Sequence, residues 1–307
     1  MTEEARRRQG TAYGFLAYLL WGAFPLYFHL LRPSGPWEIL AHRIVWTLLL
    51  CGAVLLLRRD LGWLAELARH PRRLGGVALA GALIATNWAL YTWAVLSGHV
   101  TEAALGYFLN PLVTVALGVL ILREQLRPLQ WAAVATGTVA AVYLTVDYGT
   151  PPWISFGLAA SFATYSLLKN RLGGSLSALQ SLTGESLVIL PVAVVILLAL
   201  QQSDGTTFLG HGTGHTLLLL STGVATAVPL LLFAAAASRV PLSTVGLLQF
   251  LTPFLQLLSG VLLLGETVPA SRWVGFGLVW LALLVLSVDM VRQVSHARVA
   301  RRATGTG

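Results

Sequence analysis

Cysteine and charge are what this sequence has least of. The 307 residues include a single cysteine, Cys51, which excludes an internal disulfide and every cysteine-rich metal site. Only 10% of the residues are charged, against about 25% in an average soluble domain. Hydrophobic residues make up 56% of the chain, more than one water-soluble core of this length can bury. Most side chains are therefore expected to face lipid or one another.

The motifs of common membrane enzymes and pumps are missing as well. The sequence contains no Walker phosphate-binding loop, no nucleophile elbow and no HExxH run. This excludes the usual ATP-driven pump and the commonest membrane hydrolases. His211 and His215 flank a glycine-rich stretch, but two histidines at that spacing are only a weak indication of a metal site. We expect no cofactor, no metal and no enzymatic activity.

Long apolar runs, in contrast, fill the chain. A membrane-spanning helix needs about 20 mostly apolar residues, and ten stretches meet that requirement. We expect an all-α polytopic membrane protein, with polar tails at 1–10 and 292–307. The ten expected helices cover residues 11–31, 38–57, 74–97, 101–122, 129–147, 152–168, 177–200, 215–238, 243–264 and 270–291.

The basic residues predict how these helices are oriented. If the N-terminus is cytoplasmic, 17 of the 20 Lys and Arg residues, Lys169 among them, fall on the cytoplasmic side. Only Arg32 and Arg272 fall outside, and Arg43 lies within a helix. Such an excess of positive charge on the inner side sets the orientation of membrane proteins. We expect a multi-pass membrane protein with both termini cytoplasmic, and the net charge of +8 needs no nucleic-acid partner.

The chain also repeats itself. Residues 102–147 align without gaps on residues 244–289, and 14 of the 46 positions are identical. Chance similarity between apolar segments explains paired Leu and Val, but not Pro111 with Pro253, Glu124 with Glu266, Trp131 with Trp273 and Asp147 with Asp289. Each copy holds five helices, and because five is odd the second copy enters from the opposite side. We expect two inverted repeats, 11–147 and 152–291, a design typical of secondary transporters.

Proline lies inside several of the expected helices. It removes one helix hydrogen bond and clashes with the preceding turn. Because Pro111 and Pro253 are equivalent in the repeat, we expect them to kink helices that flank a central cavity. Kinks are also expected at Pro25 and Pro229, although proline is in general frequent in membrane helices.

Ionisable residues inside membrane helices are costly and are functional candidates by default. Glu38 and His42 are four residues apart and share one helix face, and Arg43 follows directly. Glu38 also suits a first helical turn, where a carboxylate favours the helix dipole, and Glu102 has a similar position. For Arg43 we favour a function over snorkelling, with Glu38 or Glu102 as its partner.

Glu185 is the deepest carboxylate of the second half. By the helical rise it lies about 12 Å inside the helix over 177–200. A carboxylate there is protonated, paired or in contact with water. It is the best single candidate for carrying a coupling proton, and the group of Glu38, His42 and Arg43 is the other candidate. The structural alternative for Glu185 is a protonated or hydrogen-bonded residue of helix packing.

Polar and aromatic residues near the helix centres are candidates for lining a substrate cavity. Such a cavity for a small organic molecule is mostly apolar, with a few polar groups. The candidates are Asn87, Trp88, Tyr91, Tyr107, Asn110 and Gln249. Glu124 and Glu266, just past the ends of two expected helices, are expected to accept from the amides that open the next helix rather than to catalyse.

Four short runs carry a resemblance to a known family. They are residues 38–43 (EILAHR), 87–88 (NW), 105–112 (LGYFLNPL) and 235–239 (AAASR). In this order and spacing, the chain from about 10 to 292 resembles the RarD family, in the EamA-type branch of the drug/metabolite transporter superfamily. The resemblance implies ten helices, two EamA repeats and a plasma-membrane permease. It implies no catalytic residue.

Together these observations predict a secondary transporter of a small organic solute or metabolite. Alternating access would come from rocking one half against the other, with protons as the candidate coupling ion and the lipid bilayer as surroundings. Two other classes stay open. An integral-membrane enzyme would need clustered acid, base or metal ligands, and a non-transporting sensor or partner subunit would bind without flux. Substrate, direction and oligomeric state, including a homodimer, are not determined.

Overall fold

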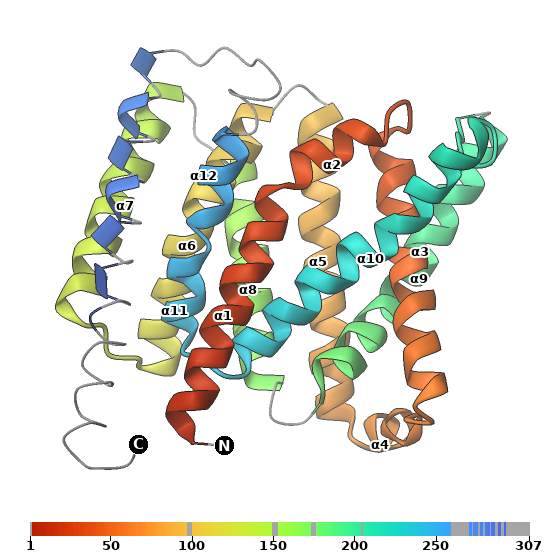
Figure 1. Cartoon of the computed structure of the whole chain (residues 1–307), viewed down its shortest axis with the longest axis horizontal. Coiled ribbons are helices and arrows are strands. Elements are labelled where there is room, and N and C mark those ends of the chain that lie inside the picture. The colour runs from red at the N-terminus through yellow and green to blue at the C-terminus, as the bar shows by residue number, and fades with distance from the viewer. Residues whose placement is uncertain are drawn as a thin grey trace.

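The structure, a computed structural model, describes residues 2–96, 100–148, 153–172, 176–203 and 205–258, and separate residues between 270 and 292. Within these ranges every regular element is a helix (Figure 1). The helices are α1 (Glu3–Gly22), α2 (Phe24–Leu30), α3 (Pro36–Leu57), α4 (Gly62–Arg69), α5 (Pro71–Leu96), α6 (Val100–Leu122), α7 (Pro128–Tyr148), α8 (Trp153–Leu172), α9 (Ala178–Gln202), α10 (Gly212–Ala237), α11 (Leu242–Leu248) and α12 (Leu251–Leu258).

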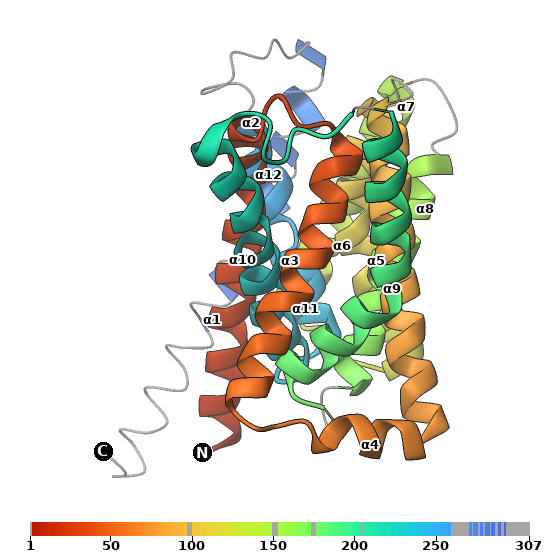
Figure 2. The ribbon, with the colours of Figure 1, turned by 90° about the vertical axis from the view of Figure 1, so that its right-hand side faces the viewer.

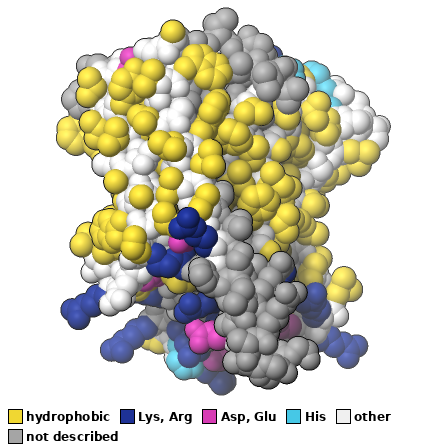
Figure 3. Space-filling view, turned by 60° about the vertical axis from the view of Figure 1, so that its left-hand side comes forward, with side chains coloured by type: hydrophobic (Ala, Val, Ile, Leu, Met, Phe, Trp, Pro, Cys, Tyr) yellow, Lys and Arg dark blue, Asp and Glu magenta, His cyan; other side chains and the backbone are white. Residues whose placement is uncertain are grey.

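The described helices suit a lipid environment. Five of them, α3, α5, α7, α9 and α10, contain segments long and apolar enough to cross a membrane. Large apolar side chains face outward, with Leu57 86% and Leu120 76% exposed. Figure 3 shows hydrophobic side chains covering the upper part of one face and Lys and Arg gathered at the lower end. That lower end is where α1 begins (Figure 1).

Two of the expected spans are interrupted. The span over 11–31 starts earlier than expected, at Glu3, and is broken between α1 and α2 at Ala23. Pro25 then lies in the first turn of α2, where its missing N–H costs no helix hydrogen bond. The span over 243–264 is likewise broken at Gln249 and Phe250, before Pro253 near the start of α12. Residues 259–269 lie outside the described ranges.

The Arg-rich connection over 58–73 contains a helix that hydropathy did not predict. α4 is only eight residues long and lies across the lower end (Figure 2). Trp63 and Leu67 are buried and pack with Leu55 and Val77, while the other face is exposed. A short amphipathic helix of this kind fits the boundary between lipid and water.

Contacts at both ends show that α3 and α9 run antiparallel. At the start of α3, Glu38 accepts a hydrogen bond of 3.0 Å from Thr206, which follows the end of α9. At the opposite end, Asp60 follows α3 and accepts a hydrogen bond of 2.9 Å from Gln180 in the first turn of α9. The two helices therefore cross the fold in opposite directions, as Figure 2 shows.

The same arrangement recurs between α7 and the described residues of 270–292. Arg127, just before α7, forms an ion pair with Asp289, and its Nε donates to Oδ1 at 3.1 Å. At the other end of α7, Asp147 accepts a hydrogen bond of 3.3 Å from Ser271. The described residues from Ser271 to Asp289 thus run antiparallel to α7.

Glu124 caps a helix, as expected, but not the next one. Its two carboxylate oxygens accept from the backbone amides of Leu242 at 2.6 Å and Ser243 at 2.7 Å. These amides open α11, so the carboxylate satisfies donors that the helix itself leaves unpaired. The contact joins the end of α6 to the second half of the chain. Glu266 lies outside the described residues.

Candidate functional site

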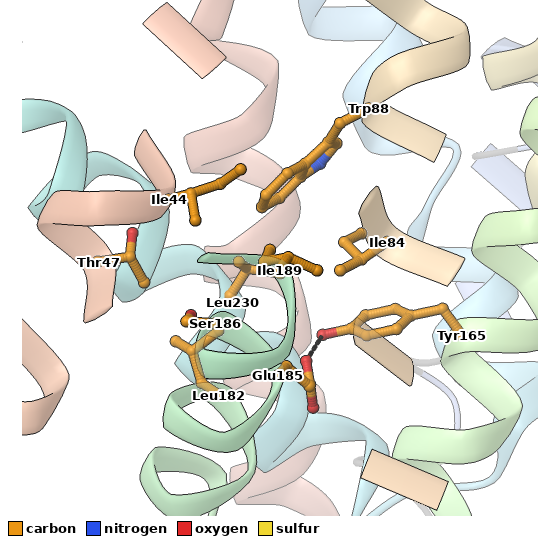
Figure 4. A pocket seen from close by; sticks show the side chains of 10 residues that line it. All are labelled: Ile44, Thr47, Ile84, Trp88, Tyr165, Leu182, Glu185, Ser186, Ile189 and Leu230. Carbon is orange, nitrogen blue, oxygen red and sulfur yellow. Dashed lines mark hydrogen bonds between the residues drawn. The ribbon is translucent and has the colours of Figure 1, made fainter. Parts of the chain in front are cut away.

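A small cavity lies where α3, α5, α8, α9 and α10 meet (Figure 4). About 10 Å³ is open to the centre of a water-sized sphere, which is room for about one water molecule. The cavity is lined by Ile44, Thr47, Ile84, Trp88, Tyr165, Leu182, Glu185, Ser186, Ile189 and Leu230. Two of the predicted site residues, Trp88 and Glu185, are therefore at its wall.

Glu185 is held by three donors. Lys169 Nζ donates to Oε1 at 2.6 Å, and Ser181 Oγ donates to the same oxygen at 2.7 Å. Tyr165 OH donates to Oε2 at 2.9 Å, the bond drawn in Figure 4. The Glu185 and Lys169 side chains are 1% and 2% exposed. Of the three states expected for Glu185, the structure has the paired one.

Lys169 is expected among the basic residues of the cytoplasmic side. In the structure it is buried and points its ammonium group at Glu185 and Ser181. A buried ion pair is tolerated only when good geometry and further hydrogen bonds offset its desolvation. Ser181 and Tyr165 provide those bonds, so the group is neutral as a whole.

Arg43 lies at the corresponding depth in α3 but contacts different kinds of side chain. Its Nε donates to Thr226 Oγ1 of α10 at 2.9 Å. The guanidinium lies 4.8 Å from the centre of the Trp88 ring, and 5.5 Å from those of Phe24 and Phe28. Aromatic faces attract a cation, particularly where water is excluded. The side chain is therefore partly buried and directed into the protein.

The expected pairing of Arg43 with Glu38 is wrong. Glu38 is 1% exposed and accepts hydrogen bonds from the connection between α9 and α10. Its oxygens accept from the Thr207 amide at 2.7 Å, the Phe208 amide at 3.0 Å and the hydroxyls of Thr206 and Thr207. Glu38 thus fixes the 205–211 loop over the start of α3. The side chain of Glu102, the other expected partner, lies outside the described residues.

His42 belongs to the Glu38 group. Its Nε2 is 3.9 Å from Glu38 Oε1, and its Nδ1 accepts from Trp46 Nε1 at 3.0 Å. Phe208 packs on the ring with 4.7 Å between centroids. The expected shared face of Glu38 and His42 is present, and both residues contact the 205–211 loop.

His215, near the start of α10, also contacts that loop. Its Nε2 is 2.9 Å from both Ser34 Oγ and Thr207 Oγ1. Within the described ranges no group of three potential metal ligands comes together.

The other predicted lining residues lie elsewhere. Asn87 is buried and donates to Leu158 O at 2.9 Å and Ser161 Oγ at 3.0 Å, so it joins α5 to α8. The rings of Tyr91 and Tyr107 are 5.7 Å apart.

Gln249 accepts from Thr114 at 3.1 Å, at the break between α11 and α12. Asn110 is buried, and its Oδ1 has no hydrogen-bond partner among the described residues. Neither residue reaches the cavity, so the polar positions predicted from the repeat form a separate group between α6 and α11.

Of the four prolines, only Pro229 adjoins the cavity. It lies inside α10 next to the lining residue Leu230. Pro111 lies inside α6. Among the described residues, α6, α11 and α12 contribute nothing to the lining. The helices that contain Pro111 and Pro253 therefore do not flank this cavity, in contrast to the expectation.

Sequence reasoning missed Lys169, Tyr165, Ser181 and Thr226. A signal for the first three was present, because Tyr165 and Lys169 are four residues apart, as are Ser181 and Glu185. Residues at that spacing share a helix face. Thr226 had no such signal, since an isolated threonine in an apolar helix is common.

Comparison with known proteins gives the family. The model of the EamA-like transporter family matches the chain twice, over residues 8–146 and 152–288. This chain belongs to the EamA-like transporter family. Protein RarD of Streptomyces exfoliatus is 50% identical over 303 residues, which cover 99% of this chain and 96% of that protein. Protein RarD of Escherichia coli is 36% identical, with 92% and 95% covered.

Other matches agree. An uncharacterized transporter of Pseudomonas aeruginosa is 41% identical over 94% of this chain and 97% of its own length. A solved crystal structure, described only as that of a protein, has the same fold with a TM-score of 0.69. It is 18% identical and covers 91% of this chain and 97% of that one.

The resemblance to the RarD family of EamA-type proteins is thereby confirmed. The chain is a multi-pass membrane protein of a transporter family. The names of its relatives indicate a transporter rather than an enzyme.

Proposed function

We propose that this EamA-type protein is a permease that moves a small organic solute or metabolite across the plasma membrane by alternating access. Its two halves, residues 11–147 and 152–291, would be inverted repeats of five helices each, with both termini in the cytoplasm. The observation that carries the proposal is the cavity with a buried charge pair on its wall. Its lining comes from α3 and α5 of the first half and α8, α9 and α10 of the second.

The directions of the helices support inversion. In the repeat, α3 is equivalent to α9, and α7 to the last expected helix. Each of these pairs runs antiparallel. Equivalent helices related by a two-fold axis in the membrane plane run in opposite directions, whereas repeats with the same orientation keep them parallel.

Two equivalent glycines support the same symmetry. Gly81 and Gly223 are 142 residues apart, the offset of the repeat. A Cβ on Gly81 of α5 would lie 3.1 Å from the backbone oxygen of Glu185 in α9. A Cβ on Gly223 of α10 would lie 2.6 Å from the backbone of Trp46 in α3. Each half therefore uses an equivalent glycine to bring its third expected helix against the second helix of the other half.

Glu185 gives the permease a group for proton coupling. In this conformation the Glu185 carboxylate forms an ion pair with Lys169 and accepts three hydrogen bonds. A proton taken up by Glu185 would remove the attraction to Lys169, loosening the contact between α8 and α9 at the cavity wall. Opening of the halves and loading of the proton would thus be linked. The site lies within one chain, so a homodimer is not needed for it.

Transport is tested with purified protein in liposomes, a panel of metabolites and an imposed pH gradient, with protein-free liposomes measuring passive leak. We expect saturable flux of at least one organic solute, recovered chemically unchanged. Recovery of an altered product would favour a membrane enzyme. Saturable binding without flux through the whole panel would favour a sensor or partner subunit.

The orientation has its own test. A reporter that is active only outside the cytoplasm is fused after Gly307, and a second fusion is made in the 205–211 loop. We expect activity from the loop fusion alone. Strong activity from the C-terminal fusion would reject the ten-helix arrangement with both ends inside.

A further inference from the structure

Most N–H donors of the Arg43 guanidinium form no hydrogen bond with the described residues. An arginine side chain carries five N–H donors. In the described part of the chain, Arg43 uses its Nε on Thr226, and the ring faces of Trp88, Phe24 and Phe28 pack around the guanidinium. Of the described residues, Tyr27, Tyr91 and Tyr107 also lie close enough for an electrostatic interaction but accept no hydrogen bond from it. Ring faces attract the charge but accept no N–H bond of ordinary strength. The two terminal nitrogens therefore have no acceptor among the described side chains.

The charge of Arg43 is also uncompensated within the described residues. Glu185 is balanced by Lys169, and Glu38 is bound by the outer loop next to His42. No other described carboxylate forms an ion pair with Arg43. The closed group at Glu185 is neutral, so the charges around the cavity leave a positive excess on the Arg43 side. A lone charge at this depth is costly unless a partner arrives.

The shape of the surroundings indicates which partner fits. The two terminal nitrogens of a guanidinium match the two oxygens of a carboxylate, which gives a bidentate pair. Trp88 connects Arg43 to the cavity, because its ring contacts the guanidinium and its side chain also lines the cavity wall. The remaining lining beside Trp88 includes Ile44, Ile84 and Ile189. A ligand held by Arg43 would extend its apolar part along these side chains.

We propose that Arg43 is the recognition group for a small organic anion, a carboxylate or similar oxyanion attached to a flat apolar body. The proposal rests on the proposed permease function and names the class of its substrate. The anion would neutralise Arg43, and its body would occupy the space beside Trp88 once the halves move apart. Thr226 would act as a positioning residue, since it fixes Nε and leaves the terminal nitrogens for the ligand.

Binding is tested with three compounds that share one ring and differ in charge: benzoate, benzamide and benzylamine. Full-length protein in nanodiscs is titrated with each, and tryptophan fluorescence is recorded. We expect benzoate to bind at least about 10-fold more tightly than the other two, because a charged bidentate pair outweighs neutral contacts. Arg43→Gln should remove this preference. Arg43→Lys, which keeps the charge but not the planar fork, should retain part of it.

The control is Arg32→Gln, at an exposed arginine of the outer connection, which should leave the benzoate preference unchanged. Thermal unfolding of each variant shows whether it is folded. Equal binding of the three compounds to the wild type would overturn the proposal. So would a folded Arg43→Gln protein that still prefers benzoate.

A flux assay separates this proposal from the permease function. Benzenesulfonate, which is permanently charged, is the anionic probe in proteoliposomes. Flux of neutral or cationic panel compounds without any anion would leave the permease standing and reject the anion site. If benzoate binding depends on Arg43 but no organic compound is transported, the anion site is supported and the permease function is rejected.

Discussion

Arg43 and Glu185 occupy equivalent positions in the two halves but have different hydrogen-bond partners. Each lies seven residues after the first residue of its helix, Pro36 of α3 or Ala178 of α9, and the two are 142 residues apart, as the repeat requires. Because α3 and α9 are antiparallel, the two charges lie toward opposite faces of the membrane. Glu185 accepts three hydrogen bonds of 2.6 to 2.9 Å, whereas one hydrogen bond is made by Arg43 to a described residue.

This difference separates a closed group from an open one. The Glu185 group is satisfied by its own chain, so it stabilises the contact between α8 and α9 until something changes its charge. Arg43 is held in place by aromatic rings and Thr226, and its terminal nitrogens form no hydrogen bond within the described part of the chain. We infer that one half supplies the group that responds to protons and the other supplies the group that recognises the solute.

The largest expected effect concerns the closed group. Lys169→Met leaves the Glu185 carboxylate buried without its counter-charge. Breaking a buried pair from one side costs about 3–5 kcal/mol. We expect a correspondingly lower stability in thermal or denaturant unfolding of the purified protein, and recovery of most of it in the double variant Lys169→Met with Glu185→Leu. A single variant as stable as the wild type would mean that the ion pair is not needed to close this side.

Arg43→Ala comes next and acts on function rather than on folding. Loss of a bidentate charged contact to the solute should lower flux at least about 30-fold, since such a contact is worth about 2–5 kcal/mol. The protein should still insert and fold, because Arg43 makes one hydrogen bond with the described part of the protein. Thr226→Val is the matched control, with a much smaller loss expected. Full flux in Arg43→Ala would return Arg43 to a structural role.

A smaller and more local effect is expected from Glu38→Gln. The amide keeps the size of the side chain but weakens the charge-assisted bonds to Thr207 and Phe208. We expect a local cost of about 1–3 kcal/mol, seen as faster protease cleavage of the 205–211 loop from outside, with only a modest loss of flux. If flux fell as far as in Arg43→Ala, Glu38 and Arg43 would have to act as one unit.

How much of this could be predicted from sequence depends on the kind of feature. The spans of α3, α9 and α10 follow from apolar runs of sufficient length, and the repeat from paired Pro, Glu, Trp and Asp residues. Interruptions near Pro25 and Pro253 agree with the kinks expected there, but their positions at Ala23 and Gln249–Phe250, a few residues before each proline, do not follow from hydropathy.

Pairing between helices was harder to predict than the helices themselves. Lys169 is typical of a surface charge because it lies near the end of an apolar run, and only the folded structure brings its side chain on α8 within reach of Glu185 on α9. The partners of Glu38 come from a loop whose backbone amides carry no signal in the sequence. The aromatic surroundings of Arg43 needed the positions of α2 and α5 as well as α3.

The most direct test of the account is uphill transport driven by a pH gradient, measured in liposomes for the panel compound with the largest flux. Glu185→Gln keeps the size of the side chain but cannot ionise. The account predicts that wild type concentrates the compound against its gradient, whereas Glu185→Gln still exchanges it across the membrane but no longer accumulates it. Accumulation by Glu185→Gln equal to that of wild type would contradict the assignment of Glu185 as the proton carrier.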